Sequence, residues 1–343
     1  MNEDRILLGH GSGGLLMKQL LDEVIFNEYT SDELDSGDDA AILHNINLQL
    51  GQKLAFSTDS FVVTPQFFAG GDIGRLAVCG TVNDVATSSA KPAAISASFI
   101  LEEGYKISDL KKICKSMADA AAEAGVKIVT GDTKVVERGK VDGIFINTSG
   151  VGVIDTGISL SGALCTPGDA VIVSGTLGDH GITIMSEREG LQFSGNLQSD
   201  AAPLNSLIAD VIATGANVKC FRDPTRGGIA STLNEFAQQS SCDITINEPD
   251  IPINEPVKAA CELLGLDPLH VANEGKMVCV CAAEDSDKVL SAMKQNKYGT
   301  SAAIIGTVQK PKDAASQKVY VKTMYGTSRI LDMLVGQQLP RIC

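Results

Sequence analysis

The chain has 343 residues, 44% of them hydrophobic and 20% charged, and a formal net charge of -14. This length suits two domains, each large enough to bury its own core. The acidic balance excludes a general nucleic-acid binder, which needs excess Lys and Arg along a groove, and no apolar run is long enough to cross a bilayer.

The first element in chain order is a glycine-rich stretch at 9–14. It matches GxGxxG, but no βαβ unit of the expected scale follows, so a nicotinamide site is improbable. Two alternatives stay open: a flexible turn, or an arm whose backbone amides close over a triphosphate. The candidate phosphate-binding residues of the arm are Gly11, Ser12, Gly13 and Gly14. A short amphipathic helix from about Leu16 follows.

Acidic and amide side chains then recur where loops meet apolar elements. They are Asp38 and Asp39, Asp59 at the end of a strand, Asn83 and Asp84 in a helix, and Asp132 after a strand at 126–130. Individually, each is typical of a cap or turn. If they converge, close pairs would repel by roughly 4 kcal/mol, which a divalent cation relieves. Oxygen ligands without His or Cys favour magnesium and phosphate chemistry.

Lys134 lies close to Asp132 in the same stretch. It is either a phosphate or carbonyl contact or a solvated surface lysine. Between 54 and 154 the patterns predict strand, helix, strand, helix, strand, strand, which indicates an α+β arrangement. The small, polar and glycine-rich segment 159–168 indicates the join to a second domain.

In the second domain, a glycine-rich turn at 175–181 precedes a helix and either receives an anion or only turns the chain. At 222–228, Asp223 is a candidate cap for a helix whose paired glycines open its N-terminus to a ligand. Glu274, the only carboxylate of the loop at 272–276, is a base or a cap. A last apolar helical turn is expected at 330–334. The predicted segments are 1–36, 37–158, 159–335 and 336–343.

The tail, 336–343, ends in Cys343. Nine scattered cysteines without a CxxC pair indicate reduced thiols, and the sequence lacks a signal peptide, so we expect a cytoplasmic protein. Core packing is expected to hold the last cysteine little, because Pro340 cannot extend a helix. Its own carboxylate disfavours the thiolate, which Arg341 only partly offsets. We expect a mobile thiol that other residues must activate.

Together these motifs resemble the HypE family of hydrogenase maturation carbamoyl dehydratases. The resemblance runs nearly end to end, through 10–14, 37–41, 83–84, 131–134, 223–228, 273–275 and 340–343. The acid and glycine blocks are similar to those of the wider aminoimidazole ribonucleotide synthetase superfamily. The terminal Pro-Arg-Ile-Cys separates this family from its relatives.

The resemblance implies a two-domain α+β fold. An N-terminal α+β domain would dimerise into a shared barrel, a C-terminal α/β domain would follow, and ATP would lie in the cleft between them. The implied magnesium ligands are Asp38, Asp59 and Asp84. The implied ATP contacts are the arm at 11–14 with Asp39, Asn83 and Asp132. The implied catalytic residues are Cys343, Lys134 and Glu274, and which of the last two is the base stays open.

The implied reaction converts a carbamoyl group on Cys343 to a cyano group. A partner carbamoyltransferase would supply the carbamoyl group, ATP would activate its oxygen, and loss of phosphate would leave a thiocyanate. An iron-bearing scaffold complex would receive the cyanide for a nickel-iron hydrogenase. One alternative is a small-molecule ATP-dependent synthetase or kinase, which needs no terminal cysteine. The other is a non-catalytic scaffold whose tail thiol docks a partner.

Overall fold

The computed structural model describes residues 14–20, 41–43, 50–191, 197–313, 317–336, 339 and 341–343. The N-terminal part is built on a five-stranded sheet of order β1-β2-β7-β5-β6. These strands are β1 (Ala41–Leu43), β2 (Lys53–Phe61), β7 (Ile144–Ile154), β5 (Lys91–Glu102) and β6 (Lys127–Val136). Only β5 and β6 pair in parallel within this sheet.

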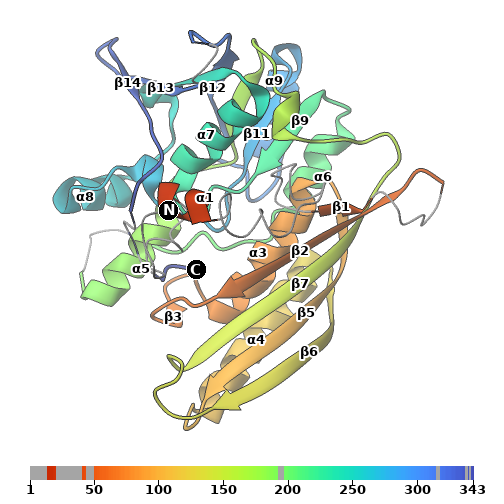
Figure 1. Cartoon of the computed structure of the whole chain (residues 1–343), viewed down its shortest axis with the longest axis vertical. Helices are drawn as coiled ribbons and strands as arrows, with labels where there is room; N and C mark the ends of the chain where they lie inside the picture. The colour runs from red at the N-terminus through yellow and green to blue at the C-terminus, as the bar shows by residue number, and fades with distance from the viewer. Residues whose placement is uncertain are drawn as a thin grey trace.

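Two helices, α3 (Ile73–Thr87) and α4 (Ile107–Ala124), cover one face of this sheet (Figure 1). The carboxylate of Asp72 starts α3 by accepting the N–H groups of Gly74 and Arg75. Helix α3 packs against both the N-terminal sheet and the C-terminal part, and it is therefore buried on nearly all sides. A short hairpin, β3 (Phe67–Phe68) and β4 (Gly71–Asp72), and α1 (Leu15–Leu20) complete the described N-terminal elements.

The C-terminal part is built on a seven-stranded sheet of order β14-β13-β10-β12-β8-β11-β9. Its strands are β8 (Ala170–Val173), β9 (Val218–Arg222), β10 (Asp243–Asn247), β11 (Val278–Cys281), β12 (Ala303–Gln309), β13 (Val319–Lys322) and β14 (Ser328–Ile330). Its helices are α5 (Asp179–Glu189), α6 (Asn205–Ala213), α7 (Gly228–Ser240), α8 (Glu255–Leu264) and α9 (Ser286–Gln295). Single 3-10 turns are η3 (Gly162–Leu164), η4 (Glu248–Asp250), η5 (Pro268–His270) and η6 (Ala283–Asp285).

The predicted α+β order from 54 to 154 is confirmed, whereas two local expectations are wrong. Residues 328–330 form an edge strand paired with β13, and 331–334 are not helical, because the turn at 323–327 folds this segment back onto the sheet. The strand expected to end at 130 runs to Val136, because its pairing with β5 continues to that residue. No helix in the described ranges is long and apolar enough to span a membrane.

Polar side chains tie the two sheets together across α3. The Asn83 amide donates to the carbonyls of Ala202 and Glu274, at 3.0 and 3.3 Å, and accepts the N–H of Leu204 at 2.7 Å. Arg75 donates to the carbonyl of Ala201 at 2.8 Å. The loop that carries Glu274 is therefore fixed to a helix of the other sheet.

Gly275 follows in this loop and contacts backbone closely: a Cβ atom there would lie 1.7 Å from the carbonyl oxygen of Asp200. We predict that Gly275→Ala lowers the free energy of unfolding by about 1–3 kcal/mol, since backbone must move to accept the methyl group. Urea denaturation measures this change. Gly336→Ala is the matched control, because a Cβ there meets none of the described residues within 4 Å. Equal unfolding midpoints for the two variants would contradict the prediction.

Candidate functional site

The end of the chain docks beside the segment that follows β2. The N–H groups of Val62 and Thr64 donate to carboxyl oxygen of Cys343 and to the carbonyl of Arg341, each at 3.1 Å. In return, Arg341 Nε donates to the Val62 carbonyl at 3.1 Å, and its guanidinium pairs with Asp142. The last residues thus pair with 62–64 in the way that an added strand does.

Apolar packing reinforces this docking. Ile342 is 5% exposed and belongs to the core cluster that contains Phe61, Phe68 and Ile184, and the partly buried Cys343 packs against the same cluster. The expectation that packing holds the last cysteine little is therefore wrong for this structure. The physical reason is that Ile342 fills an apolar pocket while the neighbouring backbone oxygens find donors.

Charged side chains from three distant segments surround the Cys343 thiol. Burial raises its pKa well above the ordinary value; Arg226 opposes this shift, and Glu274, Asp59 and Asp223 add to it. The docked thiol is therefore neutral, and a neutral thiol is a poor nucleophile. The site suits a cysteine that already carries a neutral group better than one that has to attack.

Glu274 is 2% exposed, and its Oε1 has no hydrogen-bond partner among the described residues. Its N–H donates to Asp200 Oδ1 at 3.0 Å. Burial raises the pKa of Glu274 well above its usual range, Asp223, Asp59 and Asp200 raise it further, and Arg226 opposes them. This environment favours the protonated, uncharged acid over the carboxylate, and it makes the carboxylate a stronger base once the proton is lost.

Arg226 is the cation of this cluster, and we did not assign it a role from the sequence. It lies before α7, directly before Gly227 and Gly228, which both have positive φ. Its electrostatic interactions with Cys343, Asp59 and Glu274 raise its pKa against the effect of burial. The available signal was an arginine directly before a helix start opened by two glycines.

Asp59 and Asp84 lie on the side of the N-terminal sheet that faces α3. The Ser57 hydroxyl, on the same face of β2 as Asp59, donates to Asp84 Oδ2 at 2.8 Å. Burial raises the pKa of Asp59, and Arg226 opposes the shift. Two carboxylates that present oxygen ligands fit a hard cation such as magnesium. No group of three potential metal-binding side chains occurs within the described part of the chain.

Several predicted site residues lie outside the described residues: Gly11, Ser12, Gly13, Asp38 and Asp39. Gly14 is described, and it lies against the chain just before the tail. The next residue, Leu15, donates its N–H to the Leu334 carbonyl at 2.6 Å, and a Cβ on Gly14 would lie 2.1 Å from that oxygen. Asn83 contacts backbone through both ends of its amide and so holds the Glu274 loop in place.

Lys134 and Asp132 are not brought to the thiol within one chain. They pair with each other at 2.8 Å, with side chains 69% and 61% exposed. Both lie on β6, the last strand of the sheet, and Lys134 pairs in register with Ile100, whose side chain is exposed on the face away from α3. Asp59 points to the opposite face, because its register partner Thr148 is fully buried and donates to α3.

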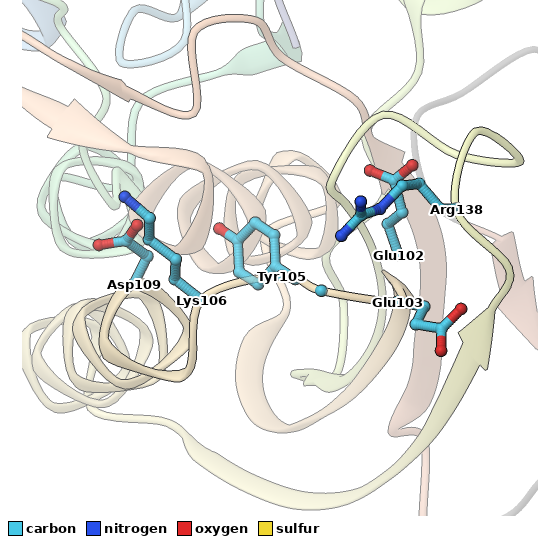
Figure 2. Close-up of a pocket in the computed structure, with 7 residues that line it drawn as sticks. Glu102, Glu103, Tyr105, Lys106, Asp109 and Arg138 are labelled. Atoms are coloured by element: carbon cyan, nitrogen blue, oxygen red, sulfur yellow. The ribbon is translucent and has the colours of Figure 1, made fainter.

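A pocket of about 520 Å³ occurs at the end of β5 and the start of α4 (Figure 2). Its lining includes Glu102, Tyr105, Lys106 and Arg138. None of the predicted site residues that the structure describes contributes to this lining. The pocket is therefore separate from the cluster around Cys343.

Two family models match the chain: the AIR synthase related protein N-terminal domain at 37–154 and the corresponding C-terminal domain at 166–318. The carbamoyl dehydratase HypE of Cupriavidus necator is 50% identical over 339 residues, covering 99% of this chain and 95% of that protein. In a HypE–HypF complex, one chain superposes with a TM-score of 0.86 at 50% identity, covering 92% of this chain and 99% of that chain.

A HypE solved in complex with ATP gives a TM-score of 0.82 at 44% identity, covering 99% of this chain and 100% of that chain. The last of these matches covers nearly the whole chain and therefore both sheets. The matches agree with the two-domain α+β fold expected from the sequence. The chain belongs to the carbamoyl dehydratase HypE family of AIR synthase related proteins.

Proposed function

We propose that this chain is an ATP-dependent carbamoyl dehydratase that acts on the S-carbamoyl group of its own Cys343. The product is an S-cyano group, which supplies the cyanide ligands of a nickel-iron hydrogenase. The observation that carries the proposal is the terminal thiol docked among Arg226, Glu274 and Asp59. A site that holds its own chain end, and penalises charge on that sulfur, suits a carried substrate.

The reaction balances in two steps. The carbamoyl oxygen attacks the γ-phosphate of ATP, ADP leaves, and one nitrogen proton is lost. A base then takes the second nitrogen proton while the carbon–oxygen bond breaks, phosphate leaves and the carbon–nitrogen triple bond forms. Glu274 is our choice of base, because its buried Oε1 is unpartnered among the described residues. Arg226 stabilises negative charge that develops on the carbamoyl oxygen.

Magnesium is the cation we propose for this site. Asp59 and Asp84 would hold it together with Asp38, and bound magnesium neutralises charge on the phosphates. The backbone amides at 11–14 would cover the triphosphate, with Asp39 as a further contact. Asn83 keeps the Glu274 loop in place, which is a positioning contribution to the proposed base.

A donor and an acceptor protein complete the proposed cycle. A carbamoyltransferase loads the thiol, and an iron-bearing scaffold complex takes the cyanide; the HypE–HypF complex among the relatives supports the first of these. Because docking buries the thiol and raises its pKa, we propose that both transfers occur with the tail undocked. The reduced state of the described cysteines fits a cytoplasmic location.

We also propose a homodimer that pairs the exposed sheet faces of two copies. On that face, Phe56, Ile100 and Val151 are 42%, 41% and 36% exposed. Such apolar exposure marks an interaction surface. Since Lys134 lies on the same face, away from the thiol of its own chain, we propose that it serves the site of the second copy.

The central prediction concerns the mass of the C-terminal peptide. We expect carbamoylated Cys343 to lose one water only when ATP and magnesium are both present. Intact and peptide mass spectrometry after single-turnover incubation measures this loss. Cys343→Ser should abolish the adduct but keep ATP binding, and omission of magnesium tests the metal. A carbamoyl adduct whose mass stays unchanged in the presence of ATP and magnesium would contradict the dehydratase proposal.

Mixed dimers test the place of Lys134. We expect Lys134→Ala homodimers to dehydrate at least roughly 100-fold more slowly, since general acid–base groups contribute about that much. Mixing them with Cys343→Ser chains should restore dehydration, because intact lysines then face intact thiols across the interface. Mass spectrometry of the Cys343 peptide in the mixture is the measurement. Failure of the mixture to recover would exclude a lysine supplied by the second copy.

The raised pKa of Glu274 predicts a pH-dependent stability. A carboxyl group whose pKa is raised in the folded state makes the folded protein less stable as pH rises. The loss begins near the pKa of the group in the unfolded chain, about 4.5, and continues through its pKa in the folded protein. Glu274→Gln cannot titrate, so its melting temperature should exceed that of the parent chain increasingly between about pH 5 and pH 8. Glu262→Gln, exposed on α8, is the control. A constant difference across this range would contradict the assignment.

A further inference from the structure

His180, the second residue of α5, holds the peptide group next to the terminal cysteine. Its ring is fully buried, and Nε2 lies 2.5 Å from the carbonyl oxygen of Ile342. On the other side of the ring, Nδ1 lies 2.7 Å from Ser199 Oγ. The Phe68 ring packs against it nearly perpendicular, with centroids 5.6 Å apart. No sequence motif had assigned this histidine a role.

The hydrogen bonds around the ring define one tautomer. A peptide carbonyl only accepts, so Nε2 must carry the proton that binds Ile342. Ser199 Oγ already accepts the N–H of Ala201 at 3.2 Å, so its own proton is available to donate to Nδ1. Burial lowers the pKa of His180, against Asp200 and the hydrogen bond to Ile342, and this direction agrees with a neutral ring. Ser199 therefore orients a neutral Nε2–H donor toward the tail.

A second side chain of α5 acts on the same stretch. Arg188 donates to the carbonyl of Arg341 at 2.8 Å and to that of Thr64 at 2.7 Å. Val62 donates to the carboxyl oxygen of Cys343. The backbone of Cys343 is thus held on both sides of its Cα, by His180 before it and Val62 after it. Only the side-chain torsions remain to place the group carried on sulfur.

We propose that His180, oriented by Ser199, is a positioning residue for the dehydration of the group on Cys343. It fixes the Cys343 backbone so that the carbamoyl oxygen meets the phosphate and the nitrogen meets the base. The inference deepens the proposed function and depends on it. Since a misplacement of about 1 Å can cost roughly 100-fold in rate, one hydrogen bond at this peptide group affects chemistry more than binding.

The experiment separates loading from dehydration. In a Cys114→Ser background, which removes the exposed thiol, potassium cyanate adds across the S–H of Cys343 to give the S-carbamoyl group. ATP and magnesium then start a single turnover, followed by mass spectrometry of the C-terminal peptide. We expect His180→Ala to dehydrate about 10- to 100-fold more slowly, with an unchanged Kd for ATP. His180→Gln, which restores an amide N–H donor, should recover most of the rate.

A second readout does not depend on turnover. Iodoacetamide should alkylate unloaded Cys343 about 10-fold faster in His180→Ala than in the parent chain, because the docked thiol is buried and neutral. Ser199→Ala, which keeps the histidine, should change both readouts in the same direction by a smaller factor. It also keeps the test decisive if His180→Ala does not fold.

Parent-like dehydration and alkylation rates in Ser199→Ala and His180→Ala would overturn the inference. Loss of ATP affinity in parallel with rate, without recovery in His180→Gln, would also overturn it, because that is the signature of a merely structural residue. If the parent chain keeps its water under all conditions, the proposed function fails instead, and the alkylation rates still decide whether His180 holds the tail.

Discussion

Docking of residues 341–343 is the interaction on which the rest of the site depends. Five hydrogen bonds, from Val62, Thr64, His180, Arg188 and Arg341 itself, contribute about 1 kcal/mol each. Burial of Ile342 adds about 2 kcal/mol. Ordering the backbone of three residues costs about 1–2 kcal/mol each, and the loss of rotamer freedom in their side chains adds to this cost. The favourable contacts and the cost of ordering nearly cancel. The docked and undocked tails therefore differ little in free energy, and the tail can leave the site easily.

The sequence predicts much of the fold and only part of the site. The strand and helix order from 54 to 154 follows from hydrophobic periodicity, because the apolar side chains of each element are the ones that pack into the core. The strand expected to end at 130 continues past Asp132 for a physical reason. The glycine and polar neighbours of Asp132 suggest a loop, but pairing with β5 extends the strand through Val136. A strand that continues alternates its side chains, and this sends Lys134 to the face away from Asp59.

Arg226 and His180 show a different limit. Each acts through atoms that are far away in the chain: Arg226 through Asp59 and Cys343, His180 through the Ile342 carbonyl. A search for metal spacing or a catalytic triad passes over such residues, because a backbone acceptor leaves no pattern in the sequence. Short sequence motifs indicate which type of reaction the protein catalyses. The packing of α5 and of the loop before α7 decides which side chains reach the thiol.

Because of the charges around Cys343, the free energy of tail docking depends on which group the sulfur carries. Burial and three carboxylates raise the pKa of the bare thiol, so an ionised Cys343 is disfavoured inside the site. A thiocarbamate and a thiocyanate have no proton on sulfur to lose and stay neutral, so they escape this penalty. Because docking is nearly balanced in free energy, a few kcal/mol of charge penalty is enough to favour an undocked thiolate over a docked one. Asp59, which would also bind magnesium, therefore favours, together with Glu274 and Asp223, exposure of the thiolate to its donor and entry of the neutral loaded form.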